Sequence, residues 1–238
     1  MDNYSERLNN AIPGGCHTYS KGDDQFPDNA PSILSHGKDS FSFDMEGNRF
    51  VDYGMGLRSI TVGYDNHEIN EAAFEQVKKG NNLTRPSFIE LEAAELLIDL
   101  IPHVEMVKFA KNGSSATSAA IKLSRAYTGK EKVVRCLQHP FFSYDDWFIG
   151  STSITKGITG STIKDTLTFN YNDVESLKTL LESNNDIAAV ILEPVTTIAP
   201  IENFLQDVKA LCKKHNVVFI LDEMISGFRF HLQGACKY

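Results

Sequence analysis

Two carboxylate residues directly follow two strongly apolar segments of the sequence. Glu193 comes after residues 187–192 (IAAVIL), and Asp222 comes after residues 217–221 (VVFIL). If both segments are strands of one parallel sheet, they deliver these carboxylates to the same edge, where ligands of such sheets bind. A buried carboxylate is costly unless a cation faces it. The acids therefore call for a cationic partner, either a protonated ring nitrogen of a ligand or a nearby base such as Arg229.

Small polar residues stand where another apolar segment gives way to a helix. Residues 106–110 (MVKFA) predict a strand, and Gly113, Ser114 and Ser115 open the helix that follows. The N–H groups and the dipole at the start of a helix favour an anion such as phosphate. A plain serine cap would give the same pattern, and neither the Walker nor the Rossmann glycine motif occurs in this sequence.

Two aromatic residues follow a further apolar segment. Phe141 and Phe142 come shortly after residues 132–136 (KVVRC), which predict another strand. A flat ligand could stack on one of these rings. Aromatic pairs of this kind also belong to hydrophobic cores, so the pattern leaves both interpretations open.

The elements that position these residues alternate between helix and strand. Continuous apolar strands alternating with amphipathic helices indicate a largely parallel sheet covered on both faces, a three-layer α/β/α arrangement. The predicted helices span residues 66–79, 87–100, 114–127, 172–182 and 202–215, and the predicted strands span residues 106–110, 132–136, 166–169, 187–192 and 217–221.

Other segments predict less regular structure. The first forty residues are interrupted by proline and glycine and predict an extended arm with turns. Residues 40–44 and 49–53 alternate apolar and polar positions around a turn that contains Gly47 and Asn48, which predicts a hairpin. Residues 150–162 are rich in glycine, serine and threonine, without periodicity, and predict a long mobile loop.

Composition excludes several classes of function. The 238 residues include 23 basic and 31 acidic side chains, and the net charge of −8 argues against a nucleic acid or an anionic membrane as partner. The seven histidines show no metal-binding spacing, and no serine-hydrolase motif occurs. No apolar run is long enough to span a membrane, and the four scattered cysteines are typical of thiols in a reducing cytoplasm.

Several segments, taken in order, resemble the class III, fold-type I pyridoxal-phosphate aminotransferases, and within them the glutamate-1-semialdehyde aminomutase-like branch. The resemblance runs over nearly the whole chain. The segments that carry it are residues 12–15 (IPGG), 44–53 (DMEGNRFVDY), 63–67 (GYDNH), 109–116 (FAKNGSSA), 191–195 (ILEPV) and, most specific, 221–229 (LDEMISGFR).

This resemblance implies pyridoxal 5'-phosphate as the cofactor. It places Gly113 and Ser114, with Asn112 before them, at the cofactor phosphate, and Asp222 at the protonated pyridine nitrogen. Phe141 matches the aromatic residue that stacks on the ring, with Phe142 as the alternative in another register. The sequence departs from the family at Ser115, where glutamate is common, and at residues 141–143 (FFS), where the family has Tyr-His-Gly.

The resemblance also implies how a substrate is handled. It places Glu193 near cofactor and substrate, makes residues 150–162 the loop that gates the site, and makes Arg58 a weaker candidate for a substrate carboxylate. The expected reaction transfers an amino group between a small-molecule amino donor and an aldehyde or keto acceptor. The intact family member is expected to be a homodimer.

The same comparison predicts an incomplete enzyme. Residues 1–60 correspond to an N-terminal arm and hairpin of the small domain, and residues 61–238 to the cofactor-binding large domain without its C-terminal part. The lysine that forms the Schiff base in the family is expected beyond Tyr238. Without it the chain is expected to be inactive alone, as a non-catalytic cofactor-binding fragment or as half of a split enzyme that needs a second chain.

Overall fold

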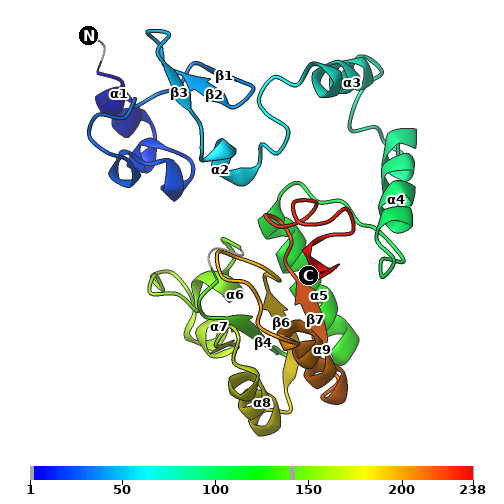
Figure 1. Cartoon of the computed structure of the whole chain (residues 1–238). Coiled ribbons are helices and arrows are strands. Elements are labelled where there is room, and N and C mark those ends of the chain that lie inside the picture. Colours follow the sequence, from blue (N-terminus) through cyan, green and yellow to red (C-terminus); the bar gives the residue numbers. More distant parts are fainter. Residues whose placement is uncertain (1–2, 140–142, 238) are drawn as a thin grey trace. The chain divides into compact units, whose positions relative to one another are not determined.

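A computed structural model describes residues 3–139 and 143–237. The chain forms two compact units, Met1–Arg85 and Pro86–Tyr238 (Figure 1). The candidate residues in the segments after the predicted strands all belong to the second unit, whereas Arg58 belongs to the first.

The first unit contains an antiparallel sheet of three strands. These are β1 (His36–Lys38), β2 (Phe41–Phe43) and β3 (Arg49–Val51), in the order β1-β2-β3. The hairpin of β2 and β3 was predicted and is confirmed. Its turn is held by the buried Asp44, which accepts hydrogen bonds from the main chain of Glu46 and Asn48 at 3.0 and 2.8 Å.

The prediction of an extended arm over the first forty residues is wrong at its beginning. Residues Tyr4–Ala11 form the helix α1, because the Asn3 side chain caps it by accepting the N–H of Glu6 at 3.0 Å. Short 3₁₀ turns follow at η1 (Pro13–Gly15), η2 (Tyr19–Lys21) and η3 (Asp23–Gln25). The helices α2 (Met55–Arg58) and α3 (His67–Lys78) complete the unit.

The second unit is built on a parallel sheet with the strand order β5-β4-β6-β7. The strands are β4 (Lys132–Cys136), β5 (Thr166–Phe169), β6 (Ile187–Leu192) and β7 (Val218–Leu221). The helices are α4 (Phe88–Leu100), α5 (Gly113–Thr128), α6 (Asp146–Ile149), α7 (Gly160–Lys164), α8 (Val174–Ser183) and α9 (Phe204–Lys214), with the turn η4 (Ala235–Lys237) near the end.

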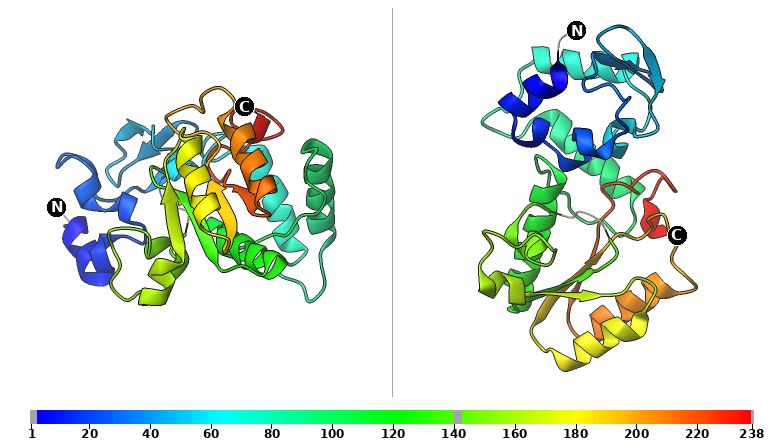
Figure 2. Two further views of the ribbon diagram at one scale, coloured as in Figure 1. Left: turned by 90° about the horizontal axis from the view of Figure 1, so that it is seen from below. Right: turned by 90° about the vertical axis from the view of Figure 1, so that its left-hand side faces the viewer.

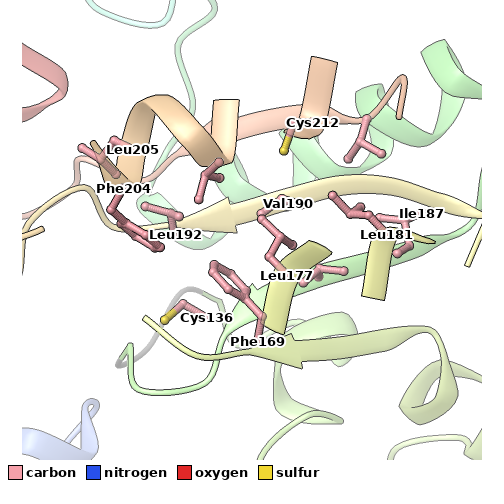
Figure 3. Close-up of a cluster of buried hydrophobic side chains, with 13 residues drawn as sticks. Cys136, Phe169, Leu177, Leu181, Ile187, Val190, Leu192, Phe204, Leu205 and Cys212 are labelled. Atoms are coloured by element: carbon pink, nitrogen blue, oxygen red, sulfur yellow. The ribbon is translucent and has the colours of Figure 1, made fainter. Parts of the chain in front are cut away.

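Helices cover both faces of this sheet, as the alternation of elements predicted. Figure 2 shows α5 on one face and α8 and α9 on the other. Along β6, Ala189 and Ile191 pack with Ile121 of α5, while Val190 and Leu192 pack with Leu177 of α8 (Figure 3). Every residue of β6 is buried, which explains why its sequence is apolar without interruption.

The predicted strand over residues 106–110 is wrong, and the predicted loop over residues 150–162 is wrong in part. Residues 106–110 form no strand, and Met106 and Phe109 are exposed. Their apolar pattern suits a strand, but a strand also requires a neighbour to take its backbone hydrogen bonds, and none of the described residues pairs with this segment. The predicted loop of residues 150–162 ends earlier than expected, because α7 begins at Gly160.

The core between the sheet and α8 buries a cluster of apolar side chains that should contribute strongly to the stability of this unit. Leu177 is completely buried there. We expect Leu177→Ala to lower the free energy of unfolding by about 2–5 kcal/mol, measured by chemical denaturation, because it leaves a cavity. Leu123→Ala removes the same atoms from a side chain that is 71% exposed, and it should change stability by no more than about 0.5 kcal/mol. Equal losses in the two variants would contradict this packing.

Candidate active site

The carboxyl ends of the central strands lie side by side and bring the two predicted acids together. Leu192 pairs with Leu221 at the end of β6 and β7, so Glu193 and Asp222 follow on adjacent strands. The N–H of Asp222 donates to the carbonyl of Leu192 at 2.9 Å. Both acidic side chains are buried, with 6% and 5% of their surface exposed. The predicted edge of the sheet therefore carries both carboxylates.

Asp222 is buried with only part of its hydrogen-bonding capacity used. One oxygen, Oδ1, accepts the N–H of Met224 at 3.0 Å, whereas Oδ2 has no partner among the described residues. Burial raises the pKa of Asp222 to about 6. Arg229, the alternative cation proposed from the sequence, donates its Nε–H to the carbonyl of Ile225 at 2.5 Å. The free oxygen of Asp222 thus fits a cationic N–H donor from a ligand.

The start of α5 offers unpaired backbone N–H groups. The side chain of Asn112 accepts the N–H of Ser115 at 2.9 Å, while the N–H groups of Gly113 and Ser114 have no acceptor among the residues that the structure describes. A Cβ atom on Gly113 would lie 1.6 Å from the Sδ atom of Met224, so any larger residue here would require the Met224 side chain to move. Because Met224 follows Asp222 by two residues, the same contact places the helix start beside the segment of the acid.

Ser114 has a second connection at this edge. Ser114 is buried, and its hydroxyl accepts a hydrogen bond from the N–H of Tyr144 at 3.3 Å. One turn later, Ser118 contacts Ser143 at 3.2 Å and accepts the indole N–H of Trp147 at 3.0 Å. Residues 143–147 are therefore held against α5. The predicted stacking residues Phe141 and Phe142 lie outside the described residues.

Glu193 is held by a histidine that the sequence analysis did not select. The N–H of Glu193 donates to Nδ1 of His139 at 2.9 Å, and His139 is only 5% exposed. Burial lowers the pKa of His139 to about 4, with a smaller contribution from the charge of Arg135. The only sequence signal for His139 is its position soon after a buried strand, which it shares with many structural residues.

Arg135 is a second buried residue that the sequence did not reveal. Arg135 is part of β4, and its guanidinium donates hydrogen bonds to the Oγ atom of Ser151 at 2.6 Å and to the carbonyl of Ser151 at 2.9 Å. It also donates to the carbonyl of Cys136 at 2.9 Å and lies 5.0 Å from the centre of the Phe148 ring. Burial lowers the pKa of Arg135. Within the described ranges no carboxylate pairs with it. Its contacts fasten the start of the loop after α6 to the strand.

Arg58 lies in α2 of the first unit, in a segment where Gly56, Leu57 and Arg58 all have positive φ angles. Its proposed role toward a substrate stays a prediction. In the described part of the chain, no group of three or more acidic, histidine or cysteine side chains is arranged to hold a metal ion, and no helix combines the length and apolar character needed to cross a bilayer.

Comparison of the sequence with known protein families identifies the family to which this chain belongs. The profile described as Aminotransferase class-III matches residues 24–230, which is most of the chain. The chain belongs to this family. Class III aminotransferases use pyridoxal phosphate, and the solved structures similar to this chain include a transaminase with PLP bound.

Curated glutamate-1-semialdehyde 2,1-aminomutases are similar over nearly all of this class III chain. The protein from Archaeoglobus fulgidus is 34% identical over 248 residues, which cover 99% of this chain and 58% of the relative. The protein from Methanothrix thermoacetophila is 31% identical over 245 residues, which cover 98% of this chain and 56% of the relative. The chain therefore spans little more than half the length of these relatives.

Solved structures confirm the predicted fold-type I architecture. An omega-transaminase from Sphaerobacter thermophilus has a TM-score of 0.88 at 24% identity, covering 99% of this chain and 57% of its own. The FumI protein of Sphingopyxis sp. MTA144, in its PLP internal aldimine form, has a TM-score of 0.86 at 28% identity, covering 95% of this chain and 55% of its own.

The contacts of Arg135 predict its effect on the loop after α6. Arg135→Met removes the hydrogen bonds to Ser151, so we expect trypsin to cleave the native protein after the exposed Lys156 several-fold faster. Arg125→Met is the matched control, because the side chain of Arg125 hydrogen-bonds to Glu131 instead. Cleavage after Lys178, in α8, reports general unfolding. An unchanged rate at Lys156 would show that Arg135 does not anchor the loop.

The raised pKa of Asp222 predicts how stability depends on pH. Because the folded state raises this pKa from 3.8 to about 6, ionisation of Asp222 costs folding free energy above pH 6, and the cost disappears as the pH falls towards 4. We expect Asp222→Asn to be more stable than the parent chain by about 2–3 kcal/mol at pH 7.5, and the difference to shrink towards pH 4. Urea denaturation at several pH values measures it. A stability difference between the two proteins that does not change with pH would contradict the raised pKa of Asp222.

Proposed function

We propose that this chain forms the cofactor-binding part of a pyridoxal-phosphate-dependent aminotransferase or 2,1-aminomutase. The reaction transfers an amino group between a small-molecule amino donor and an aldehyde or keto acceptor. The unpartnered buried oxygen of Asp222, in a segment whose Met224 side chain contacts the start of α5, is the observation that carries the proposal. When bound, the cofactor supplies an electron-withdrawing ring that stabilises negative charge on the substrate carbon.

Asp222 holds a proton on the ring nitrogen. Its ionised carboxylate has one oxygen without a partner, and a protonated pyridine nitrogen supplies both the missing donor and the compensating positive charge. The N–H of Met224 fixes the other oxygen and so sets the orientation of the carboxylate. Pairing with this cation favours the ionised form, which reverses the effect of burial on the pKa of Asp222.

The start of α5 binds the phosphate. The N–H groups of Gly113 and Ser114 point out of the first turn without acceptors, and the helix dipole adds to their attraction for an anion. The hydroxyl of Ser114 accepts from Tyr144 and keeps its own proton for donation. Asn112 contributes indirectly, because its side chain caps Ser115 and fixes where the helix begins.

The remaining assignments rest on the resemblance to the family. Phe141, or Phe142 in the alternative register, stacks on the ring, and Glu193 lies near cofactor and substrate. Arg58 binds a substrate carboxylate, and residues 150–162, shortened by the start of α7, gate the site. The functional enzyme is a homodimer in the cytoplasm, and the four free thiols are consistent with a reducing compartment.

We further propose that residues 1–238 alone bind the cofactor without catalysing transfer. No lysine in residues 1–238 matches the lysine that the family uses to hold the cofactor covalently. Because that lysine also acts as the general acid and base of the family's reaction, transfer is not expected without it. The competing proposal is a split enzyme, in which a second chain supplies the lysine. Transaminase activity that appears only on mixing with such a chain would favour the split enzyme.

Cofactor binding tests the proposal directly. Pyridoxamine 5'-phosphate needs no lysine for binding, so we expect it to bind the chain, and pyridoxamine without the phosphate to bind more weakly. Asp222→Ala should weaken binding of the phosphate form by about tenfold or more, because the ring nitrogen loses its charged partner. Calorimetric titration measures both affinities.

The matched control for this test is Asp207→Ala, which removes an exposed carboxylate from α9. It should leave the affinity for pyridoxamine 5'-phosphate unchanged. If the parent chain fails to bind, or if the two variants bind equally well, the proposed function is wrong.

A further inference from the structure

Two side chains from different loops hold the main chain of Glu193 and Pro194, directly after β6. His139, from the segment after β4, accepts the N–H of Glu193 at 2.9 Å. Tyr171, from the segment after β5, donates its hydroxyl to the carbonyl of Pro194 at 2.8 Å. The two residues therefore fix two neighbouring residues of one turn from two separate strands of the sheet.

His139 can accept this hydrogen bond only in its neutral form with the proton on Nε2, because Nδ1 must offer its lone pair. The ring is 5% exposed, and its burial disfavours the charged form. At neutral pH the acceptor is thus always available to Glu193. A histidine at a solvent-exposed position would lose the interaction near its ordinary pKa.

Tyr171 is itself held in place on three sides. Its N–H donates to the side chain of Gln138 at 2.9 Å, its ring lies 4.8 Å from the ring of His139, and it meets the ring of Phe204 edge-on at 5.0 Å. Phe204 is the first residue of α9 and is buried in the core. The hydroxyl therefore reaches Pro194 from a rigid support.

We propose that His139 and Tyr171 are positioning residues that fix the turn at Glu193 and thereby the place of its buried carboxylate in the site. The inference rests on the proposed function, in which Glu193 lies near cofactor and substrate. Neither residue belongs to the segments that carry the family resemblance. They act on Glu193 through its main chain, so they influence binding without touching the cofactor.

Three variants separate positioning from simple packing. His139→Leu removes the acceptor, whereas His139→Asn keeps one, because the asparagine oxygen takes the place of Nδ1. Tyr171→Phe removes only the hydroxyl and retains the ring, so it tests the proposal even if His139→Leu fails to fold. Thermal unfolding of each variant establishes whether the fold is retained.

Amide hydrogen exchange at Glu193, measured by NMR without cofactor, reports the turn itself. We expect His139→Leu to speed exchange of this amide by about tenfold or more, and His139→Asn to restore slow exchange. Equal exchange in the parent chain and His139→Leu would overturn the proposal for His139. Equal acceleration in both His139 variants would reduce its role to packing and would also overturn it.

Affinity for pyridoxamine 5'-phosphate reports the consequence for the site. We expect His139→Leu and Tyr171→Phe each to weaken binding several-fold, with His139→Asn close to the parent chain. If Asp222→Ala abolishes binding while His139→Leu and Tyr171→Phe bind as tightly as the parent, the positioning role is wrong and the proposed function stands. If the parent chain does not bind at all, the proposed function fails, and the exchange of Glu193 alone decides whether the turn is held as described.

Discussion

The pairing of β6 with β7 buries the carboxylate of Asp222 at the end of β7. The N–H of Asp222 is fixed by the carbonyl of Leu192, and one carboxylate oxygen by the N–H of Met224. The second oxygen is buried and has no donor among the described residues. Burial of an ionised group without a partner is unfavourable, so the fold carries a cost that a cationic ligand would remove.

The surrounding elements are arranged about this edge of the sheet. Met224 packs against Gly113, which sets the distance between the segment of the acid and the start of α5. On the neighbouring strands, Arg135 connects β4 to the loop after α6, and His139 connects the end of β4 to Glu193. Both contacts include a backbone group of the partner segment, the carbonyl of Ser151 for Arg135 and the N–H of Glu193 for His139. Each contact therefore fixes the main chain of the segment that it reaches. The sheet therefore positions Glu193 and Asp222, while the Asn112 cap fixes where the start of α5 lies in the chain.

Sequence reasoning succeeded where one physical rule decides the structure. Residues 187–192 were predicted within their observed bounds because a strand buried on both faces must be apolar at every position. The helix of residues 87–100 was predicted within one residue of its observed bounds, and Ser87 and Glu90 form a capping box at its start. Residues 106–110 were mispredicted because strand formation also depends on a partner that lies elsewhere. His139 and Arg135 were missed because their partners lie far along the sequence or in the main chain, which no local pattern of side chains reveals.

Burial acts on two titratable groups at this edge of the sheet, and it affects their hydrogen bonds differently. Burial favours the neutral form of both His139 and Asp222, which lowers the pKa of the histidine and raises that of the acid. Neutral His139 accepts the N–H of Glu193 through Nδ1, so the form that burial favours is the form that makes this hydrogen bond. Asp222 remains largely ionised above pH 6, with an oxygen that no described protein group reaches. The same desolvation thus supports a hydrogen bond within the protein at His139 and leaves a buried oxygen of Asp222 open to a cationic donor, where we propose that the cofactor would bind.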